Sequence, residues 1–380
     1  MQPPSNLAGN MRLADSFIVD ASELNWTSNF EVLTSQSDLG HINALEVYSP
    51  DLPAFTDIFK KPAPALRSLV ILHHTRETLG NDIWAENANR WIETDSWTIP
   101  SPLFNGDIPE LKCLILQSVI FSPSTINFAG CNLVHMSIDL SECVSFGLSS
   151  PGEWLDVLST QRNLESLTLR LGIWKARASC DVYLHRQAVN LPRLQEFSLH
   201  CDIADAGDIL GDMILPSTCV LRIYLTQLSC NQSWDGIAHG LFSYLLSWQG
   251  IFGGSISANG VWEIATLASE EEELFTILFH GPQCGNPAIH QVHFNLEFRA
   301  PKDILEKEYP SAQYIPPLGD FLMIIREGVS YMAGSLIGVA LDMGSPIHRA
   351  NERSLEEFLD MFTRVIPQKY SYGKVPTDRV

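Results

Sequence analysis

The amino-acid sequence predicts an α/β solenoid, in which short parallel strands form a curved sheet and helices cover the outer face of that sheet. Two observations predict this fold. An apolar triad recurs along the chain, with two residues between its first and second members and one between its second and third. The segments between triads show the apolar spacing of helices. An ordinary parallel α/β sheet also alternates strands with helices, but the fixed triad favours the solenoid.

Each triad fits a strand that the chain enters through a turn. Its last two members lie two residues apart, so they face the same side of an extended chain, and the first lies where the chain turns into the core. The triads begin at residues 42, 66, 111, 133, 164, 194 and 220, so the intervals are 22 to 31 residues except for one of 45. One additional degenerate unit is therefore expected near residues 91–100. Leucine-rich repeats have periods of roughly 20–29 residues, which these intervals overlap. The triads are Ile42-Leu45-Val47, Leu66-Leu69-Ile71, Leu111-Leu114-Leu116, Leu133-Met136-Ile138, Leu164-Leu167-Leu169, Leu194-Phe197-Leu199 and Val220-Ile223-Leu225.

Two segments between triads predict helices. Residues 151–164 place apolar side chains three and four positions apart after a Pro-Gly start. Residues 203–215 show the same spacing and end at Pro216. Beyond residue 225 the triad fades, and strand character continues in residues 260–267, 274–279 and 292–298.

These patterns predict three regions. Residues 1–40 form an N-terminal cap or remnant. Residues 41–300 form the repeat domain, with clear triads up to residue 225 and degenerate ones after it. Residues 301–380 form a helical C-terminal region and tail.

Composition excludes several classes of partner. The 380 residues include 24 Lys and Arg against 44 Asp and Glu, a net charge of −20, and no basic run. Such a chain repels phosphate groups, so nucleic acid is not an expected partner. The most apolar stretch, residues 329–341, is shorter than the ~20 residues of a spanning helix, so a membrane is not expected either. The eight cysteines form no C-x-x-C pair and no signal peptide is seen, which predicts reduced, buried thiols and a cytoplasmic or nuclear location.

The sequence contains no catalytic or cofactor-binding motif. Neither G-x-S-x-G nor a phosphate-binding glycine loop occurs, so we expect a non-enzymatic protein without cofactor or metal. Four residues have side chains that zinc accepts, but the last two are an odd number of positions apart on a predicted strand and would face opposite sides. These residues are His280, Cys284, His290 and His293.

Four segments resemble the leucine-rich-repeat portion of F-box proteins, most closely the large F-box-like group of mushroom-forming fungi. The resemblance covers roughly residues 40–300. It implies a non-catalytic protein that binds other proteins, as the substrate receptor of a cullin–RING ubiquitin ligase. The segments are FNGDIPELKCLIL (104–116), SPGEWLDVLSTQRNLESLTL (150–169), VNLPRLQEFSL (189–199) and LPSTCVLRIYL (215–225).

Residues 1–40 depart from that family, because they contain neither the Leu-Pro-x-Glu start nor the amphipathic helices of an F-box. Either the F-box has been lost, or the sequence begins downstream of the true start, or the module is too divergent to recognise. Binding to the ubiquitin-ligase adaptor is expected only if an F-box lies upstream. The alternatives are a stand-alone leucine-rich-repeat scaffold without a ligase role and an α/β hydrolytic enzyme, although no nucleophile–base set emerges for the latter.

The predicted binding surface is the concave face, formed by residues between and just after the apolar members of each triad. The early units offer apolar side chains there and the later units polar ones, which suits a protein or peptide partner. A merely solvated polar face is the alternative. The early positions are Val70, Leu72, Cys113 and Ile115.

In the later units three rows are expected to cross the strands. They are His135–Ser166–Glu196–Arg222, Ser137–Thr168–Ser198–Tyr224 and Asp139–Arg170–His200–Thr226. The candidate partner-binding residues are His135, Asp139, Arg170, Glu196, His200, Arg222 and Tyr224.

Overall fold

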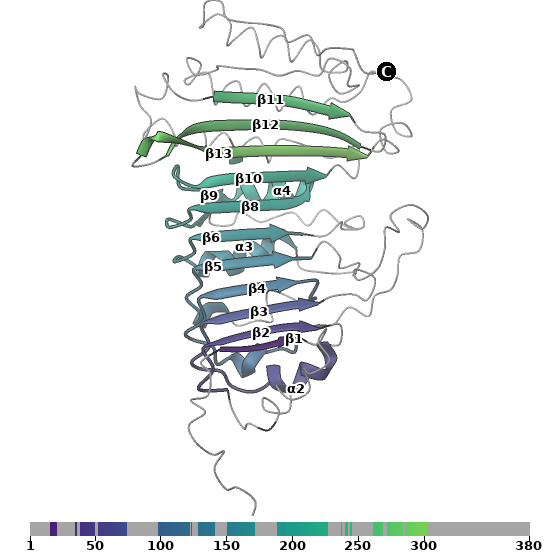
Figure 1. The fold of residues 1–380 in the computed structure, drawn as a ribbon, viewed down its shortest axis with the longest axis vertical. Coiled ribbons are helices and arrows are strands. Elements are labelled where there is room, and N and C mark those ends of the chain that lie inside the picture. Colours follow the sequence, from purple (N-terminus) through teal and green to yellow (C-terminus); the bar gives the residue numbers. More distant parts are fainter. Residues whose placement is uncertain are drawn as a thin grey trace, which may run out of the picture. The chain divides into compact units, whose positions relative to one another are not determined.

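The computed structural model describes two compact units, Met1–Thr168 (unit 1) and Leu169–Val380 (unit 2), each of which is α/β (Figure 1). No described helix is long and apolar enough to cross a lipid bilayer. The described residues are 16–20, 35, 39–49, 52–73, 98–121, 123, 128–140, 150–171, 188–226, 237, 240, 241, 244, 261–268, 272–283 and 286–301. The predicted helical region after residue 301 lies outside them, as do most of residues 1–40.

Unit 1 contains a parallel sheet whose strand order follows the chain. The last two members of each triad are buried and the residues between them face outward, as the sequence predicts. The first strand was not predicted, because it carries no triad. The strands are β1 (Ser16–Asp20), β2 (Ala44–Ser49), β3 (Ser68–His73), β4 (Cys113–Gln117) and β5 (His135–Asp139), and β6 (Ser166–Arg170) contains the boundary between the units.

β3 pairs directly with β4 in unit 1, so no strand lies between them. The expected additional unit near residues 91–100 therefore contributes nothing to the sheet at this point, and that prediction is wrong. Residues 91–97 lie outside the described residues.

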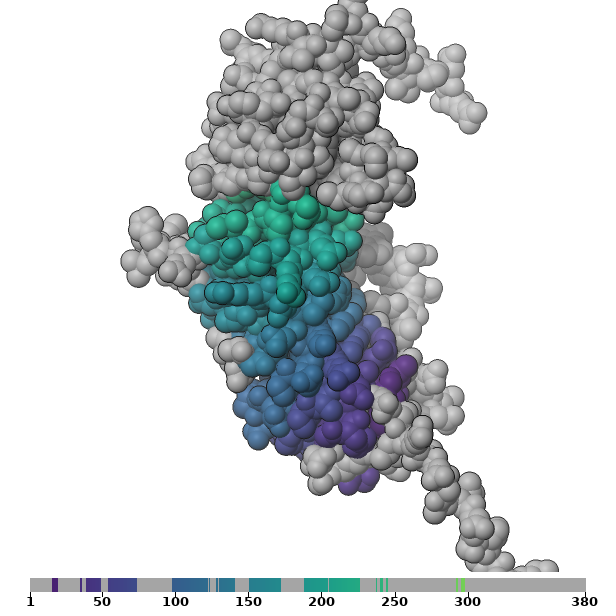
Figure 2. Space-filling view, turned by 90° about the vertical axis from the view of Figure 1, so that its left-hand side faces the viewer, coloured from purple at the N-terminus to yellow at the C-terminus, as the bar shows by residue number. Residues whose placement is uncertain are grey.

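The same turn precedes β2, β3, β4 and β6. The N–H of the first triad residue donates to the carbonyl three residues earlier, as in Leu66 to Ala63 at 3.1 Å, whereas the N–H of Leu133 before β5 donates to Oε1 of Gln161. The next two N–H groups, those of Arg67 and Ser68, both donate to the carbonyl of Asn43, the residue directly before β2, at 2.7 and 3.1 Å. Figure 2, seen from the amino ends of the strands, shows this side of unit 1 from purple to blue. The paired bonds recur from Lys112 and Cys113 to Arg67, from Val134 and His135 to Lys112, and from Glu165 and Ser166 to Val134.

Helix α3 (Pro151–Thr160) confirms the first predicted helix and lies behind the strands in Figure 1. Ser150 caps it by accepting the Glu153 N–H, and proline occupies its first turn, where no amide donor is needed. Its fully buried Trp154 meets Phe121 edge to face, with centroids 5.6 Å apart. The shorter helices of unit 1 are η1 (Leu52–Phe55), α2 (Thr56–Phe59), η3 (Leu103–Gly106) and η5 (Phe128–Gly130).

Unit 2 contains three neighbouring parallel strands followed by two antiparallel ones. The later strands confirm the predicted strand segments after residue 225. In order across the sheet they are β8 (Glu196–Asp202), β10 (Val220–Thr226), β13 (Asn286–Pro301), β12 (Glu272–Gln283) and β11 (Val261–Ala268).

Helix α4 (Ile203–Gly211) follows β8 and packs against β8 and β10, with Asp202 as its cap. It is shorter than the predicted helix over residues 203–215. The chain leaves the helix at Gly211 because β9 (Met213–Ile214) pairs with β7 (Val189–Asn190) in a separate two-stranded sheet. The Val189 N–H donates to the Asp212 carbonyl at 2.7 Å beside that pairing.

Candidate functional site

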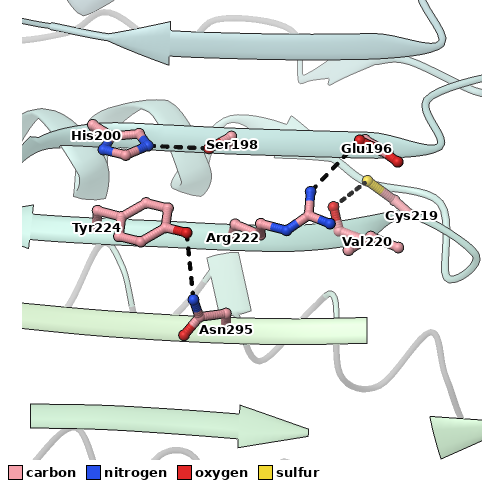
Figure 3. A network of polar contacts seen from close by, with 8 residues as sticks. All are labelled: Glu196, Ser198, His200, Cys219, Val220, Arg222, Tyr224 and Asn295. Atoms are coloured by element: carbon pink, nitrogen blue, oxygen red, sulfur yellow. Dashed lines mark hydrogen bonds and ion pairs between the residues drawn. The ribbon is translucent and has the colours of Figure 1, made fainter. Parts of the chain in front are cut away.

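The seven candidate residues lie in both units, on outward-facing strand positions. His135 and Asp139 belong to β5 of unit 1, and both are partly exposed. Arg170 is the exposed last residue of β6. Glu196, His200, Arg222 and Tyr224 belong to β8 and β10 of unit 2, and they form the polar network of Figure 3.

The rows predicted across β8 and β10 are wrong by two residues. Ser198 lies opposite Arg222, His200 lies opposite Tyr224, and Glu196 lies opposite Val220. Thr226 was expected beside His200 but lies opposite Asp202. Because side chains alternate with a period of two, this even shift keeps the predicted residues whose side chains are described on the outward face and changes only their neighbours.

The turn before β10 explains the shift. The Cys219 N–H donates to the Pro216 carbonyl at 3.0 Å, and the very next N–H, that of Val220, already donates to the Gln195 carbonyl at 2.7 Å. In unit 1 two residues, Arg67 and Ser68, separate the turn residue Leu66 from Leu69, whereas Val220 alone separates Cys219 from Leu221. The turn residue is also Cys219 and not Val220, the predicted first member of the triad, so two differences of one residue each give the shift of two. Leu221, rather than Ile223, therefore comes to lie opposite Phe197.

Two aromatic rings lie at the centre of the network. The imidazole of His200 and the ring of Tyr224 stack with centroids 4.0 Å apart and planes 18° from parallel. The Ser198 hydroxyl lies 3.2 Å from Nε2 of His200. Nδ2 of Asn295 donates to the Tyr224 hydroxyl at 3.5 Å, which ties β13 to the pair (Figure 3). Both rings are partly exposed, so they form a flat, preorganised surface.

The ion pair of the network is a weak one. Nη1 of Arg222 lies 3.5 Å from Oε2 of Glu196, and the two side chains are 36 % and 58 % exposed. Exposed pairs of this kind contribute roughly 0–1 kcal/mol to stability, so the guanidinium can exchange Glu196 for another carboxylate at little cost.

Asn295 is a site residue that the sequence analysis missed. It lies opposite Arg222 on β13, and its Oδ1 is buried without a hydrogen-bond partner. Neighbouring side chains along a strand face opposite sides, so the alternating pattern of residues 292–298 predicts that Asn295 and Leu296 face different sides. Because Leu296 is buried, Asn295 faces outward. What the sequence did not show is that β13 pairs with β10, because some sixty residues separate the two strands.

The described thiols are poor nucleophiles. Burial, together with the carboxylate of Glu196, raises the pKa of Cys219 to about 12. Burial also raises the pKa of Cys201 well above its ordinary value, beside the carboxylates of Asp205 and Asp202. Cysteine reacts as the thiolate, which these groups do not form near neutral pH.

Among the side chains that the structure describes, no three that could hold a metal ion gather, and the suggested zinc ligands are not among those side chains. His280 lies on β12 opposite Val292, and Pro282 lies opposite His290. Cys284 lies outside the described residues.

The outward faces of β1 to β4 in unit 1 carry apolar side chains, as the sequence predicts for the early units. Their exposed or partly exposed side chains include Ile18, Val70, Leu72 and Ile115. Glu46 lies among them, and its Oε2 accepts a hydrogen bond from the Tyr48 hydroxyl at 2.9 Å.

A comparison of the chain with protein-family models, with curated proteins and with solved structures finds no match. The fold and the site alone define the class of protein. It is an α/β protein with parallel strands, and the outward face of unit 2 is polar. The likeness to F-box proteins stays a prediction from the sequence.

Proposed function

We propose that the chain is a non-catalytic leucine-rich-repeat protein that binds a protein partner on the outward faces of its parallel strands. The observation that carries the proposal is the polar face of unit 2. There a stacked His200–Tyr224 pair lies beside a loosely paired Arg222 and the buried, unpartnered Oδ1 of Asn295. Tyrosine and arginine dominate the energetics of protein interfaces.

The leucine-rich-repeat part of the proposal rests on local geometry. The turn, the paired hydrogen bonds and the buried apolar positions recur from strand to strand in unit 1. A recurrent unit that pairs only with its sequence neighbours is what a repeat architecture requires.

The resemblance to F-box proteins supplies the cellular role that we propose. The bound protein would be a substrate of a cullin–RING ubiquitin ligase in the cytoplasm or nucleus, and the ligase adaptor would bind through an F-box if one lies upstream. A stand-alone binding scaffold is the alternative. Co-purification of the full-length gene product with the adaptor favours the ligase role, and its absence favours the scaffold.

The binding proposal is tested by affinity capture from cell extract with cross-linking, followed by affinity measurements on the partner so identified. We expect Arg222→Ala and Tyr224→Ala each to weaken binding by about tenfold or more. Arg170→Ala tests whether the surface continues to β6. Arg193→Ala is the matched control, because Arg193 is exposed in the turn before β8 and lies off the face. Unchanged affinity in Arg170→Ala, Arg222→Ala and Tyr224→Ala would refute the proposed site.

A further inference from the structure

The outward face of unit 1 carries a group of six side chains that we name the β1–β4 patch. One row of it crosses four strands: Ile18 lies opposite Glu46, Glu46 opposite Val70, and Val70 opposite Ile115. The next row places Tyr48 opposite Leu72. Ile18 is 53 % exposed and the other five are partly exposed. The patch is Ile18, Glu46, Tyr48, Val70, Leu72 and Ile115.

The charge of this face has one sign. Glu46 and Asp139 are the acidic residues at the described outward positions of β2 to β5, and none of those positions holds Lys or Arg. Within the described part of the chain, Glu46 lies in no ion pair and accepts its hydrogen bond from Tyr48. Neighbouring strands lie ~4.8 Å apart, so the carboxylate is flanked closely by Ile18 and Val70.

This arrangement restricts what can cover the patch. A purely apolar partner would remove water from the Glu46 carboxylate without replacing its hydrogen bonds, which is unfavourable. An acidic partner would add repulsion to a chain of net charge −20. Arginine and lysine avoid both penalties, because their aliphatic stems lie along apolar side chains while the charged end reaches the carboxylate.

We propose that the β1–β4 patch binds a protein segment in which an Arg or Lys lies among aliphatic residues, with the cation paired to Glu46. The proposal rests on the proposed function, since it assumes a binding protein, and it adds a second surface and the chemistry of its ligand. The aliphatic residues of the segment would cover Val70, Leu72 and Ile115.

The probe is a phage-displayed library of random dodecapeptides, selected on the full chain. Selected peptides are synthesised with a fluorescent label, and their affinities are measured by anisotropy. We expect a consensus with Arg or Lys between aliphatic residues. Replacing the basic residue by a neutral one, citrulline for Arg or norleucine for Lys, should weaken binding by about tenfold.

Two variants with the same change of charge locate the site. Glu46→Gln removes the carboxylate but keeps an oxygen that can accept the Tyr48 hydroxyl, and it should weaken binding by about tenfold. Glu110→Gln changes an exposed glutamate in the turn before β4 and should change affinity by less than about twofold. The Glu46→Gln variant should bind the neutral peptide at least as tightly as the basic peptide, because it lacks the carboxylate with which the cation pairs. Val70→Thr keeps the shape of the side chain and should weaken binding through its added hydroxyl.

Peptides without a basic residue, or equal binding to the chain and to Glu46→Gln, would overturn this inference. If peptides with either of these outcomes bind Tyr224→Ala more weakly than the unchanged chain, the proposed function stands and the proposal for the β1–β4 patch is refuted. A chain that selects no peptide and captures no partner would contradict both. Self-association that is abolished by Val70→Thr would assign the patch to a second copy of the chain and would also overturn the inference.

Discussion

The rings of His200 and Tyr224 lie stacked across β8 and β10, with centroids 4.0 Å apart. A cross-strand aromatic pair of this kind contributes about 0.5–1.5 kcal/mol beyond the area that it buries. In a double-mutant cycle, His200→Ala and Tyr224→Ala should therefore show a coupling free energy of about that size in urea unfolding. The pair His200→Ala and Arg193→Ala should be additive, because Arg193 lies in the turn before β8. Additivity in both cycles would show that the stack does not stabilise the fold.

A buried glutamine joins η5 to the turn before β5 in unit 1. Nε2 of Gln161 donates to the Phe128 carbonyl at 2.8 Å, and its Oε1 accepts the Leu133 N–H at 3.2 Å. Gln161→Leu keeps the volume but leaves the Leu133 N–H without a partner, while the Phe128 carbonyl still accepts the Cys131 N–H at 3.0 Å. We therefore expect a loss of about 1–3 kcal/mol in the free energy of unfolding. Asn163→Ala, two residues further along, removes an exposed hydrogen bond to Asn132 and should cost less than about 1 kcal/mol. Similar losses in the two variants would contradict this account.

Gly240 has no room for a side chain. A Cβ at this position would lie 2.4 Å from the Leu210 carbonyl oxygen at the end of α4, and the obstacle is backbone. Gly240→Ala should therefore lower the free energy of unfolding by about 1–3 kcal/mol, despite the better helix propensity of alanine. Gly130→Ala is the control, because a Cβ there meets nothing within 4 Å. Thermal melting that is equally unaffected in both variants would disprove the close packing.

The buried thiols make stability depend on alkaline pH. Burial raises the pKa of Cys131 to about 11 and that of Cys219 to about 12, from an ordinary value of 9.0. Between about pH 9 and 12 the folded chain therefore holds protons that the unfolded chain has lost. Its stability should fall as the pH rises through this range. Urea unfolding at pH 8 and 10.5 should show a smaller decrease for Cys219→Ala than for the unchanged chain. Equal decreases would exclude a contribution from this thiol.

The sequence predicts local features of this protein well and pairings between distant segments poorly. The triads identify the strands and their outward residues because burial of one face imposes a period of two. The neighbours of Arg222 could not be predicted in the same way, because the turn before β10 ends one residue earlier than the triad indicates and is also one residue shorter. Asn295 joins the site only through the pairing of β13 with β10, which no local pattern reports.

The recurring turn of unit 1 also determines where the chain can change in length. The peptide group between Arg67 and Ser68 donates its N–H to the Asn43 carbonyl and accepts the Lys112 N–H at its own carbonyl, and the Lys112 carbonyl in turn accepts from Val134. A row of peptide groups thus runs across the strands at their amino ends, and each bond in such a row polarises the next. One residue inserted between Ala63 and Leu66 would interrupt it. The paired bonds of this row recur before β3, β4, β5 and β6, although the triads of these strands begin 22 to 45 residues apart. New loops can thus be gained at the carboxyl edge of the sheet without altering the turns at its amino edge.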